Sequence, residues 1–333
     1  SGADTLTGNS LGNRLTGGPG NDRLIGAAGD DTYLFNPTSV AEADQVLENP
    51  NEGTDTLSFA SLTTSVAINL GTTSIQPVHA NRTVKLNSAV AFENLIGGSG
   101  ADTLFGNTLN NTVTGGAGDD KLVGAGGSDS LLGGAHNDTY IFVPATFAEA
   151  DQVIENPDEG TDTLSFPYLT TGITVNLGLT SAQAVHLNRT LKLNSVMGFE
   201  NVIGGSGADT LFGNRLNNTL TGGDGDDLLN GGPGSDLLLG GAGNDTYFFA
   251  SSSSAEADQV TEKANEGVDT LNFAYLTTGV ALNLGSTSIQ AVHTNRTLKL
   301  NSIGTFENAV GGSGSDMLLG NALANRLTGG SGH

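Results

Sequence analysis

Large apolar residues recur at every ninth position along much of the chain, each within a short stretch that follows a glycine-rich, acidic one. When units are counted from their first glycine, at 97, 106, 115, 124 and 133, the eighth residues are Leu104, Val113, Leu122, Leu131 and Tyr140. The same register returns at 204–248 with Leu211, Leu220, Leu229, Leu238 and Tyr247. An apolar residue between polar ones predicts a short, half-buried strand, so each unit is expected to hold one turn and one strand.

Two successive units fit one coil of turn, strand, turn and strand. Units of the same parity would then stack, so that Asp102, Asp120 and Asp138 line one edge while Asn111 and Asp129 line the other. No long 3.6-residue periodicity is present, and the best helix candidate, SVAEADQV at 39–46, is predicted to be a loop. The pattern predicts an all-β fold, a parallel β-roll or β-solenoid, which we expect to be right-handed.

A second, longer period divides the chain into three tandem modules. ENPNEGTDTLSF at 48 returns as ENPDEGTDTLSF at 155 and as EKANEGVDTLNF at 262. Between the repeats lie inserts whose segments, in the first module TYLF, DQVLEN, DTLSF, VAINL, VKLN and FENLIG, predict short strands. We therefore expect one continuous solenoid. Its nine-residue repeats occupy 1–34, 97–141, 204–248 and 311–333, and its β inserts occupy 35–96, 142–203 and 249–310.

Charge and composition narrow the class of partner. The 333 residues include 35 Asp and Glu against 12 Lys and Arg, a net charge of −23, and no cysteine. This balance argues against nucleic acid and against an anionic membrane surface, and it favours a cation. No apolar run is long enough for membrane insertion, and the lack of cysteine removes any disulfide framework or thiol chemistry. Because the sequence opens and closes in the middle of a repeat unit, we expect it to be part of a longer protein.

The acidic residue of the repeat suits calcium chemistry. Asp occupies the sixth position of most units, directly before the strand, and glycine occupies the first, second and fourth positions. Glycine permits a turn tight enough to direct carbonyl oxygens inward, and calcium takes six to eight oxygen ligands that mix carboxylates with backbone carbonyls. An isolated Asp is more often an ordinary turn residue, but stacked rows of Asp favour metal ligation.

The phrase GGxGxDxUx, in which U is a large apolar residue, resembles the calcium-binding nonapeptide of the RTX (repeats-in-toxin, or hemolysin-type) proteins that bacteria secrete. The resemblance covers nearly the whole chain. It implies that each calcium ion lies between two stacked turns, one coil apart in the sequence, where carbonyls of both turns and both aspartates hold it. It also implies export, so we expect the chain to be secreted, extracellular or on a cell surface.

Carried onto this sequence, the resemblance implies several calcium ions, roughly five to eight. The implied aspartate ligands are Asp4, Asp22, Asp31, Asp102, Asp120, Asp129, Asp138, Asp209, Asp227, Asp236, Asp245 and Asp316. The implied turn glycines are Gly97, Gly98, Gly100, Gly115, Gly116, Gly118, Gly204, Gly205, Gly207, Gly222, Gly223 and Gly225. The units with a neutral sixth residue, Asn13, Asn111 and Asn218, should bind calcium more weakly or form an Asn ladder without metal.

Two groups of insert residues each have two interpretations. The first comprises Asp44, Asp55, Asp151, Asp162, Asp258 and Asp269, which are either turn residues and strand starts or additional calcium ligands. The second is the motif HxNRTxKL, with His79, Arg82, Lys85, His186, Arg189, Lys192, His293, Arg296 and Lys299. It is either a structural loop or hairpin whose cations pair with Glu93, Glu200 and Glu307, or a patch that binds acidic sugars.

These features predict a structural protein whose folding depends on calcium. Thin stacked strands bury little apolar surface and the carboxylates repel one another, so metal binding should supply the missing stability. No GxSxG, HExxH or GxxxxGK[ST] motif occurs, and we do not expect an enzyme. We expect a spacer, adhesin stalk or surface-layer element, with extracellular polysaccharide or a cell surface as a further partner. The alternative is a carbohydrate-binding or carbohydrate-processing β-helix module that uses HxNRTxKL.

Overall fold

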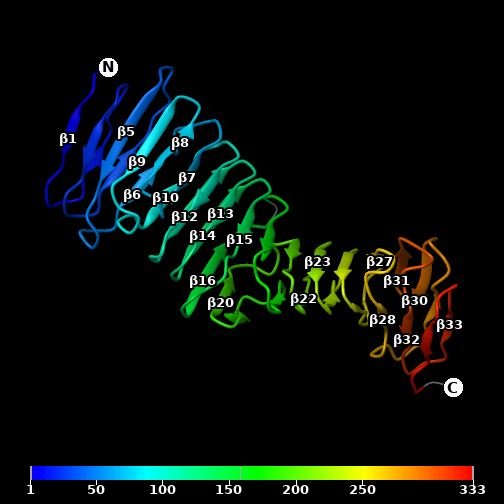
Figure 1. Cartoon of the computed structure of the whole chain (residues 1–333). Helices are drawn as coiled ribbons and strands as arrows, with labels where there is room; N and C mark the ends of the chain where they lie inside the picture. Colours follow the sequence, from blue (N-terminus) through cyan, green and yellow to red (C-terminus); the bar gives the residue numbers. More distant parts are fainter. Residues whose placement is uncertain (1, 158, 332–333) are drawn as a thin grey trace. The chain divides into compact units, whose positions relative to one another are not determined.

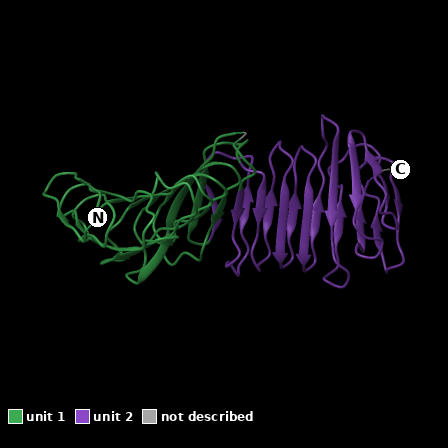
Figure 2. Cartoon of the chain, turned by 90° about the horizontal axis from the view of Figure 1, so that it is seen from above, with its two compact units in different colours: residues 1–162, 187–198 green, residues 163–186, 199–333 purple. Residues whose placement is uncertain are grey.

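The computed structural model describes residues 2–157 and 159–331, so positions 1, 158, 332 and 333 of the predicted blocks lie outside it. The described residues contain short strands and no helix, and hence no helix that could cross a membrane. Strands follow one another from the N-terminal to the C-terminal end of the chain in Figure 1. The chain forms two compact units, Ser1–Asp162 with Leu187–Gly198, and Thr163–His186 with Phe199–His333 (Figure 2).

The strands of the first unit lie in three ladders. The first ladder runs in the order β1 (Thr5–Thr7), β3 (Arg23–Ile25), β5 (Glu42–Leu47), β9 (Arg82–Leu86), β8 (Ile75–His79). The second runs β2 (Arg14–Leu15), β4 (Thr32–Leu34), β6 (Thr56–Ser58), β10 (Asn94–Ile96), β12 (Thr112–Ala117), β14 (Ser130–Ala135), β16 (Glu149–Ile154), β20 (Arg189–Leu193). The third runs β7 (Ala67–Asn69), β11 (Thr103–Phe105), β13 (Lys121–Val123), β15 (Thr139–Ile141).

The second unit repeats this arrangement. One ladder runs β17 (Thr163–Ser165), β21 (Asn201–Ile203), β23 (Thr219–Asp224), β25 (Leu237–Ala242), β27 (Glu256–Thr261), β31 (Arg296–Leu300), β30 (Gln290–His293). A second runs β18 (Thr174–Asn176), β22 (Thr210–Phe212), β24 (Leu228–Asn230), β26 (Thr246–Phe248), β28 (Thr270–Asn272), β32 (Asn308–Val310), β34 (Arg326–Thr328). The remaining strands are β19 (Gln183–His186) and the pair β29 (Ala281–Asn283) and β33 (Met317–Leu319).

The repeats form the predicted parallel coil. Leu104 lies opposite Leu122, and Leu122 lies opposite Tyr140, in the parallel ladder β11, β13, β15. Val113 lies opposite Leu131 in the parallel pair β12 and β14. Strands one coil apart in the sequence are therefore neighbours, and alternate nine-residue units belong to different sheets. The prediction of an all-β parallel β-roll or solenoid is confirmed.

The core lies inside the coil, between the sheets. Leu104, Leu122 and Tyr140 are fully buried, as are Leu211, Leu229 and Tyr247 in the second unit, whereas Leu6 and Leu318 in the first and last repeat blocks are only partly buried. In the first insert the Phe35 and Phe59 rings stack at 4.7 Å between centroids. A core only one or two large side chains wide per turn buries little apolar surface, so the coil depends on what its turns contribute.

The first insert continues the stack but changes its spacing. All six segments predicted as strands in the first insert form strands, yet Thr56 on β6 faces Thr32 on β4, and Asn94 on β10 faces Thr56. In both pairs more residues of sequence separate the facing positions than in the repeat, where Leu104 faces Leu122. The predicted loop at 39–46 is wrong from Glu42 onward, because Glu42, Asp44 and Val46 alternate with exposed residues and form strand β5. Of the loop or hairpin considered for HxNRTxKL, the structure shows the hairpin, in which β9 pairs antiparallel with the preceding β8.

Candidate metal centres

The sixth-position aspartates form continuous rows. Each lies just before its strand, and in most of them one carboxylate oxygen accepts the backbone N–H of the row member one turn earlier in the stack. At the start of a row Asp102, Asp209 and Asp316 accept the N–H of Val66, Ile173 and Val280 instead. Asp102 donates to Asp120 Oδ1 at 2.7 Å, and Asp120 donates to Asp138 Oδ1 at 2.8 Å. In the second unit Asp209 donates to Asp227 and Asp227 to Asp245 at 2.7 and 2.8 Å. The same contact joins Asp4 to Asp22 and Asn13 to Asp31.

The other carboxylate oxygen of most row members is buried and has no hydrogen-bond partner in the described protein. The residues concerned are Asp22, Asp31, Asp120, Asp129, Asp138, Asp227, Asp236, Asp245 and Asp316, each through Oδ2. A buried charged oxygen without a partner is strongly destabilising unless a cation or a proton compensates it. These oxygens are hard ligands, and they fit calcium.

Two predicted ligands differ from the rest. Asp102 Oδ2 accepts the Gly98 N–H at 2.6 Å, and Asp209 Oδ2 accepts the Gly205 N–H at 2.8 Å, so both oxygens of these first row members already have backbone donors. Asp4 is exposed and Asp316 is partly exposed, while the other ten predicted aspartates are buried. The row positions therefore offer different numbers of free oxygens.

The neutral row members use their amides within the protein. Asn111 Oδ1 accepts the Asn107 N–H at 2.7 Å, and its Nδ2 donates to the carbonyls of Phe92 and Glu93. Asn218 repeats this with Asn214 and Glu200. Asn13 Oδ1 accepts the Asn9 N–H in the same way. Their amide oxygens already have backbone donors, so these positions offer a cation fewer ligands than the Asp positions do. The next row member is an aspartate in each case, so Asn side chains do not stack on one another at these positions.

The predicted glycines lie in turns stacked too closely for side chains. They occupy the segments before β11, β13, β22 and β24, where β12 and β23 run on into the turns. Gly116 and Gly118 have φ angles of 117° and 111°, a left-handed backbone that favours glycine. A Cβ added at Gly118 would lie 2.7 Å from the carbonyl carbon of Gly100 in the neighbouring turn. The turns thus bring backbone carbonyls of successive coils together beside the Asp rows.

Burial and mutual repulsion raise the pKa values of several row members. Burial raises the pKa of Asp120 to about 7, and the charges of Asp102 and Asp138 on either side contribute to this increase. Burial likewise raises the pKa of Asp129 and of Asp227 to about 7. Without metal these three carboxyls are therefore partly protonated near neutral pH, and a divalent cation would displace the protons.

At the ends of the rows, aspartates of the inserts accept the backbone N–H of the last aspartate of the repeat. Asp44 Oδ1 accepts the Asp22 N–H at 3.0 Å, although the loop before Asp44 makes this step longer than a regular coil. Asp151 and Asp258 do the same for Asp129 and Asp236. Asp44 therefore lies within strand β5 as a row member, which is neither a turn nor a strand start.

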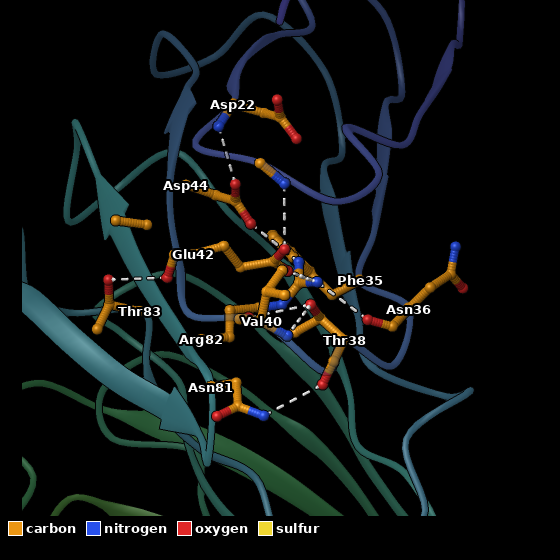
Figure 3. A network of polar contacts seen from close by, with 12 residues as sticks. Asp22, Phe35, Asn36, Thr38, Val40, Glu42, Asp44, Asn81, Arg82 and Thr83 are labelled. Atoms are coloured by element: carbon orange, nitrogen blue, oxygen red, sulfur yellow. Dashed lines mark hydrogen bonds and ion pairs between the residues drawn. The ribbon is translucent and has the colours of Figure 1, made fainter. Parts of the chain in front are cut away.

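The other oxygen of Asp44 pairs with arginine (Figure 3). Arg82 Nη1 donates to Asp44 Oδ2 at 2.9 Å, and the guanidinium also pairs with Glu42 and lies 5.1 Å from the centroid of Phe35. The other two modules repeat this arrangement. Arg189 pairs with Glu149 and Asp151 and lies over Phe142, and Arg296 pairs with Glu256 and Asp258 and lies over Phe249.

The prediction that these arginines pair with Glu93, Glu200 and Glu307 is wrong. Strand β9 pairs with β5 so that Arg82 lies opposite Glu42, with both side chains on the buried face. Glu93 Oε2 instead accepts the Asp55 N–H at 2.8 Å, and Glu307 accepts that of Asp269. Because the arginines are only 4–6% exposed and already paired, they are not available to an acidic sugar. The lysines of the motif, Lys85, Lys192 and Lys299, are exposed.

Three buried acidic clusters join the repeats to the inserts. They are Asp31, Glu48 and Asp55; Asp138, Glu155 and Asp162; and Asp245, Glu262 and Asp269. The aspartates were candidates from the sequence, but the glutamates were missed. Their signal was present, since Glu48, Glu155 and Glu262 follow the DQV strand at the same place in every module.

Comparison with known proteins agrees with this geometry. The family model of the RTX calcium-binding nonapeptide repeat matches residues 1–34, 96–131, 105–140, 197–215, 213–247 and 310–333. No curated protein matches the sequence significantly. The matched segments contain the Asp rows and their glycine turns, and the repeat is a calcium-binding structural element. The chain therefore contains RTX calcium-binding nonapeptide repeats in each of its repeat blocks.

Proposed function

We propose that this chain is a spacer segment of a secreted or cell-surface bacterial protein, such as an adhesin stalk or a surface-layer element, and that it folds when it binds calcium outside the cell. The role is structural, not catalytic. The observation that supports it is the series of buried, unpartnered Oδ2 atoms along the Asp rows. In each of these carboxylates a backbone N–H donates to the other oxygen, Oδ1. This hydrogen bond fixes the position of Oδ2, which we propose as the calcium ligand.

The charge of the chain supports coupling between metal binding and folding. A net charge of −23 opposes compaction, and the rows place carboxylates on successive turns of the coil. Divalent cations between the turns would cancel this repulsion and link neighbouring coils. Calcium sites of extracellular modules bind in the range of about 10⁻⁴–10⁻³ M, and we expect the same here, so the segment would stay unfolded at the far lower calcium concentration inside a cell.

A distance measurement within the first unit tests this proposal. The chain has no cysteine, so Ser10→Cys and Ser99→Cys, at two exposed positions, allow a specific pair of fluorescent labels. With millimolar calcium, single-molecule energy transfer should give one narrow distribution, as expected of a rigid spacer. With magnesium or without metal, the distribution should be broad. An equally narrow distribution in the metal-free protein would contradict the proposal.

A further inference from the structure

Each module contains a compact group of three buried carboxylates where the repeat block meets the insert. In the first module Asp31 precedes β4, Glu48 directly follows β5 and Asp55 precedes β6. One oxygen of each lies within 4.8 Å of the others, and the three residues are 0–2% exposed. The corresponding groups in the other modules have the same composition and the same degree of burial.

Hydrogen bonds hold two of these carboxylates by one oxygen and leave the other oxygen unpartnered. Asp31 Oδ1 accepts the Asn13 N–H at 2.6 Å, and Glu48 Oε1 accepts the hydroxyl of Tyr33. Asp31 Oδ2 and Glu48 Oε2 are buried and have no partner among the described residues. The same two atoms are unpartnered in Asp138 and Glu155, and in Asp245 and Glu262.

A glycine forms one side of each cluster. A Cβ added at Gly26 would collide with Asp31 Oδ2, Glu48 Oε1 and the Tyr33 hydroxyl, and one added at Gly133 or Gly240 would meet the equivalent three atoms. The carboxylates and the tyrosine hydroxyl therefore converge on one backbone position. That turn can contribute backbone oxygen, which calcium accepts alongside carboxylates.

The charge of the cluster is not balanced by the protein. Among the described residues, no lysine or arginine forms an ion pair with Asp31, Glu48 or Asp55. Three adjacent buried carboxylates must bind a proton or a cation. One proton would leave two charges in contact, whereas one divalent cation cancels two charges and bridges all three side chains.

We propose that these three clusters are calcium sites of a second kind, one for each module, in which a glutamate and an aspartate of the insert join one aspartate of the repeat. The proposal rests on the calcium-binding role proposed above but concerns ligands outside the nonapeptide. Such an ion would tie the repeat turn, the end of β5 and the start of β6 together. It would therefore make folding of each insert depend on calcium as well.

The first test counts bound calcium in the full chain by equilibrium dialysis. Glu48→Gln, Glu155→Gln and Glu262→Gln together remove one ligand charge from every cluster. The matched control is Glu52→Gln, Glu159→Gln and Glu266→Gln, which makes the same charge change four positions later, outside the clusters. We expect the cluster variant to bind fewer ions, one fewer for each cluster, and the control to match the wild type.

The outcomes separate the two proposals. If the wild type binds no calcium, the calcium-dependent role itself is wrong. If calcium binds and both variants bind the same number of ions, only the clusters are wrongly assigned, and they hold protons. Glu262→Gln alone leaves two clusters intact and should lose a single ion, which keeps the test decisive if the triple variant does not fold.

A second test uses the tyrosines beside the clusters. The chain has no tryptophan, and Tyr33, Tyr140 and Tyr247 are buried while Tyr168 and Tyr275 are exposed. Terbium can replace calcium, and a tyrosine in contact with the site should sensitise its emission. In a Tyr168→Phe and Tyr275→Phe background we expect strong tyrosine-excited emission that Glu48→Gln, Glu155→Gln and Glu262→Gln greatly reduce. Terbium binding without such emission would overturn the proposal.

Discussion

Asp120 and Asp138 occupy the same position of two stacked turns, and the backbone N–H of Asp120 donates to Asp138 Oδ1 at 2.8 Å. This contact joins the two turns beside the parallel pair β13 and β15, and it points the carboxylate along the row. It leaves Asp120 Oδ2 and Asp138 Oδ2 buried without partners among the described residues. The row is therefore well ordered but electrostatically unfavourable until a cation binds, and this conflict leads to the following predictions.

Neutralising a row member should have opposite effects with and without calcium. Asp120→Asn keeps the side-chain shape and the acceptor oxygen but removes a buried charge. We expect it to weaken calcium-dependent stabilisation and to stabilise the metal-free chain, each by on the order of 1–3 kcal/mol. Urea unfolding at millimolar calcium measures the first effect. The sucrose concentration at which the chelator-stripped chain gains β signal in far-ultraviolet circular dichroism measures the second. Asp119→Asn, the exposed neighbour, is the control and should change neither by more than about 0.5 kcal/mol.

The metal-free protein should be more stable in acid than in base. The pKa values of Asp120, Asp129 and Asp227 are raised from 3.8 to about 7, so the folded chain binds more protons than the unfolded chain between these values. Stability is then largest near pH 4 and is lost as the pH rises through about 7. Thermal unfolding of chelator-stripped protein at pH 5 and pH 8 tests this. Greater stability at pH 8 would show that the rows do not carry these raised pKa values.

The buried arginines should matter for stability and not for sugar binding. Arg296→Met removes the partner of two buried carboxylates, Glu256 and Asp258, and should cost about 3–5 kcal/mol in urea unfolding with calcium. Lys299→Met, on the exposed face of the same strand, should cost less than about 0.5 kcal/mol. Calorimetric titration with a uronate oligosaccharide should give no binding that depends on Arg296. Specific loss of such binding in a folded variant would instead support the carbohydrate module.

Turn geometry should limit calcium affinity. Gly116 has a φ of 117°, and its Cβ position is blocked by the Gly98 carbonyl, whereas a Cβ at Gly126 would meet only Thr108 Cα, at 3.8 Å. Gly116→Ala should cost about 2 kcal/mol or more and raise the calcium concentration needed for folding, while Gly126→Ala should leave it nearly unchanged. Equal calcium midpoints for the two variants would mean that close stacking of the turns is not required.

The nine-residue period of the sequence predicted the structure of the repeat blocks, where the period is regular. A shift by one coil maps each turn onto the next, so the strand register, the buried row of Leu104, Leu122 and Tyr140, and the Asp rows could all be read in advance. At HxNRTxKL the sequence left a loop and a hairpin open, because only the second of the two hairpin strands, VKLN, was predicted. Coil geometry converts a regular sequence directly into regular contacts.

The insert contacts could not be predicted because their spacing follows no period. Asp44 and Asp55 continue two rows after unequal steps, since the loops between strands differ in length. Arg82 meets Glu42 through strand pairing, whereas Glu93 lies closer to it in the sequence. Glu48 was overlooked because a single acid at a strand end is usually solvated, and only the turn that packs over it reveals its burial.

A calcium titration of chelator-stripped protein, followed by far-ultraviolet circular dichroism with magnesium as the control, tests the central claim most directly. The account predicts a cooperative gain of β signal near millimolar calcium and none with magnesium. A metal-free protein at pH 7.5 that already shows the full β signal, and that calcium does not change, would contradict it. The Asp rows would then be turns whose buried charges are balanced by protons alone.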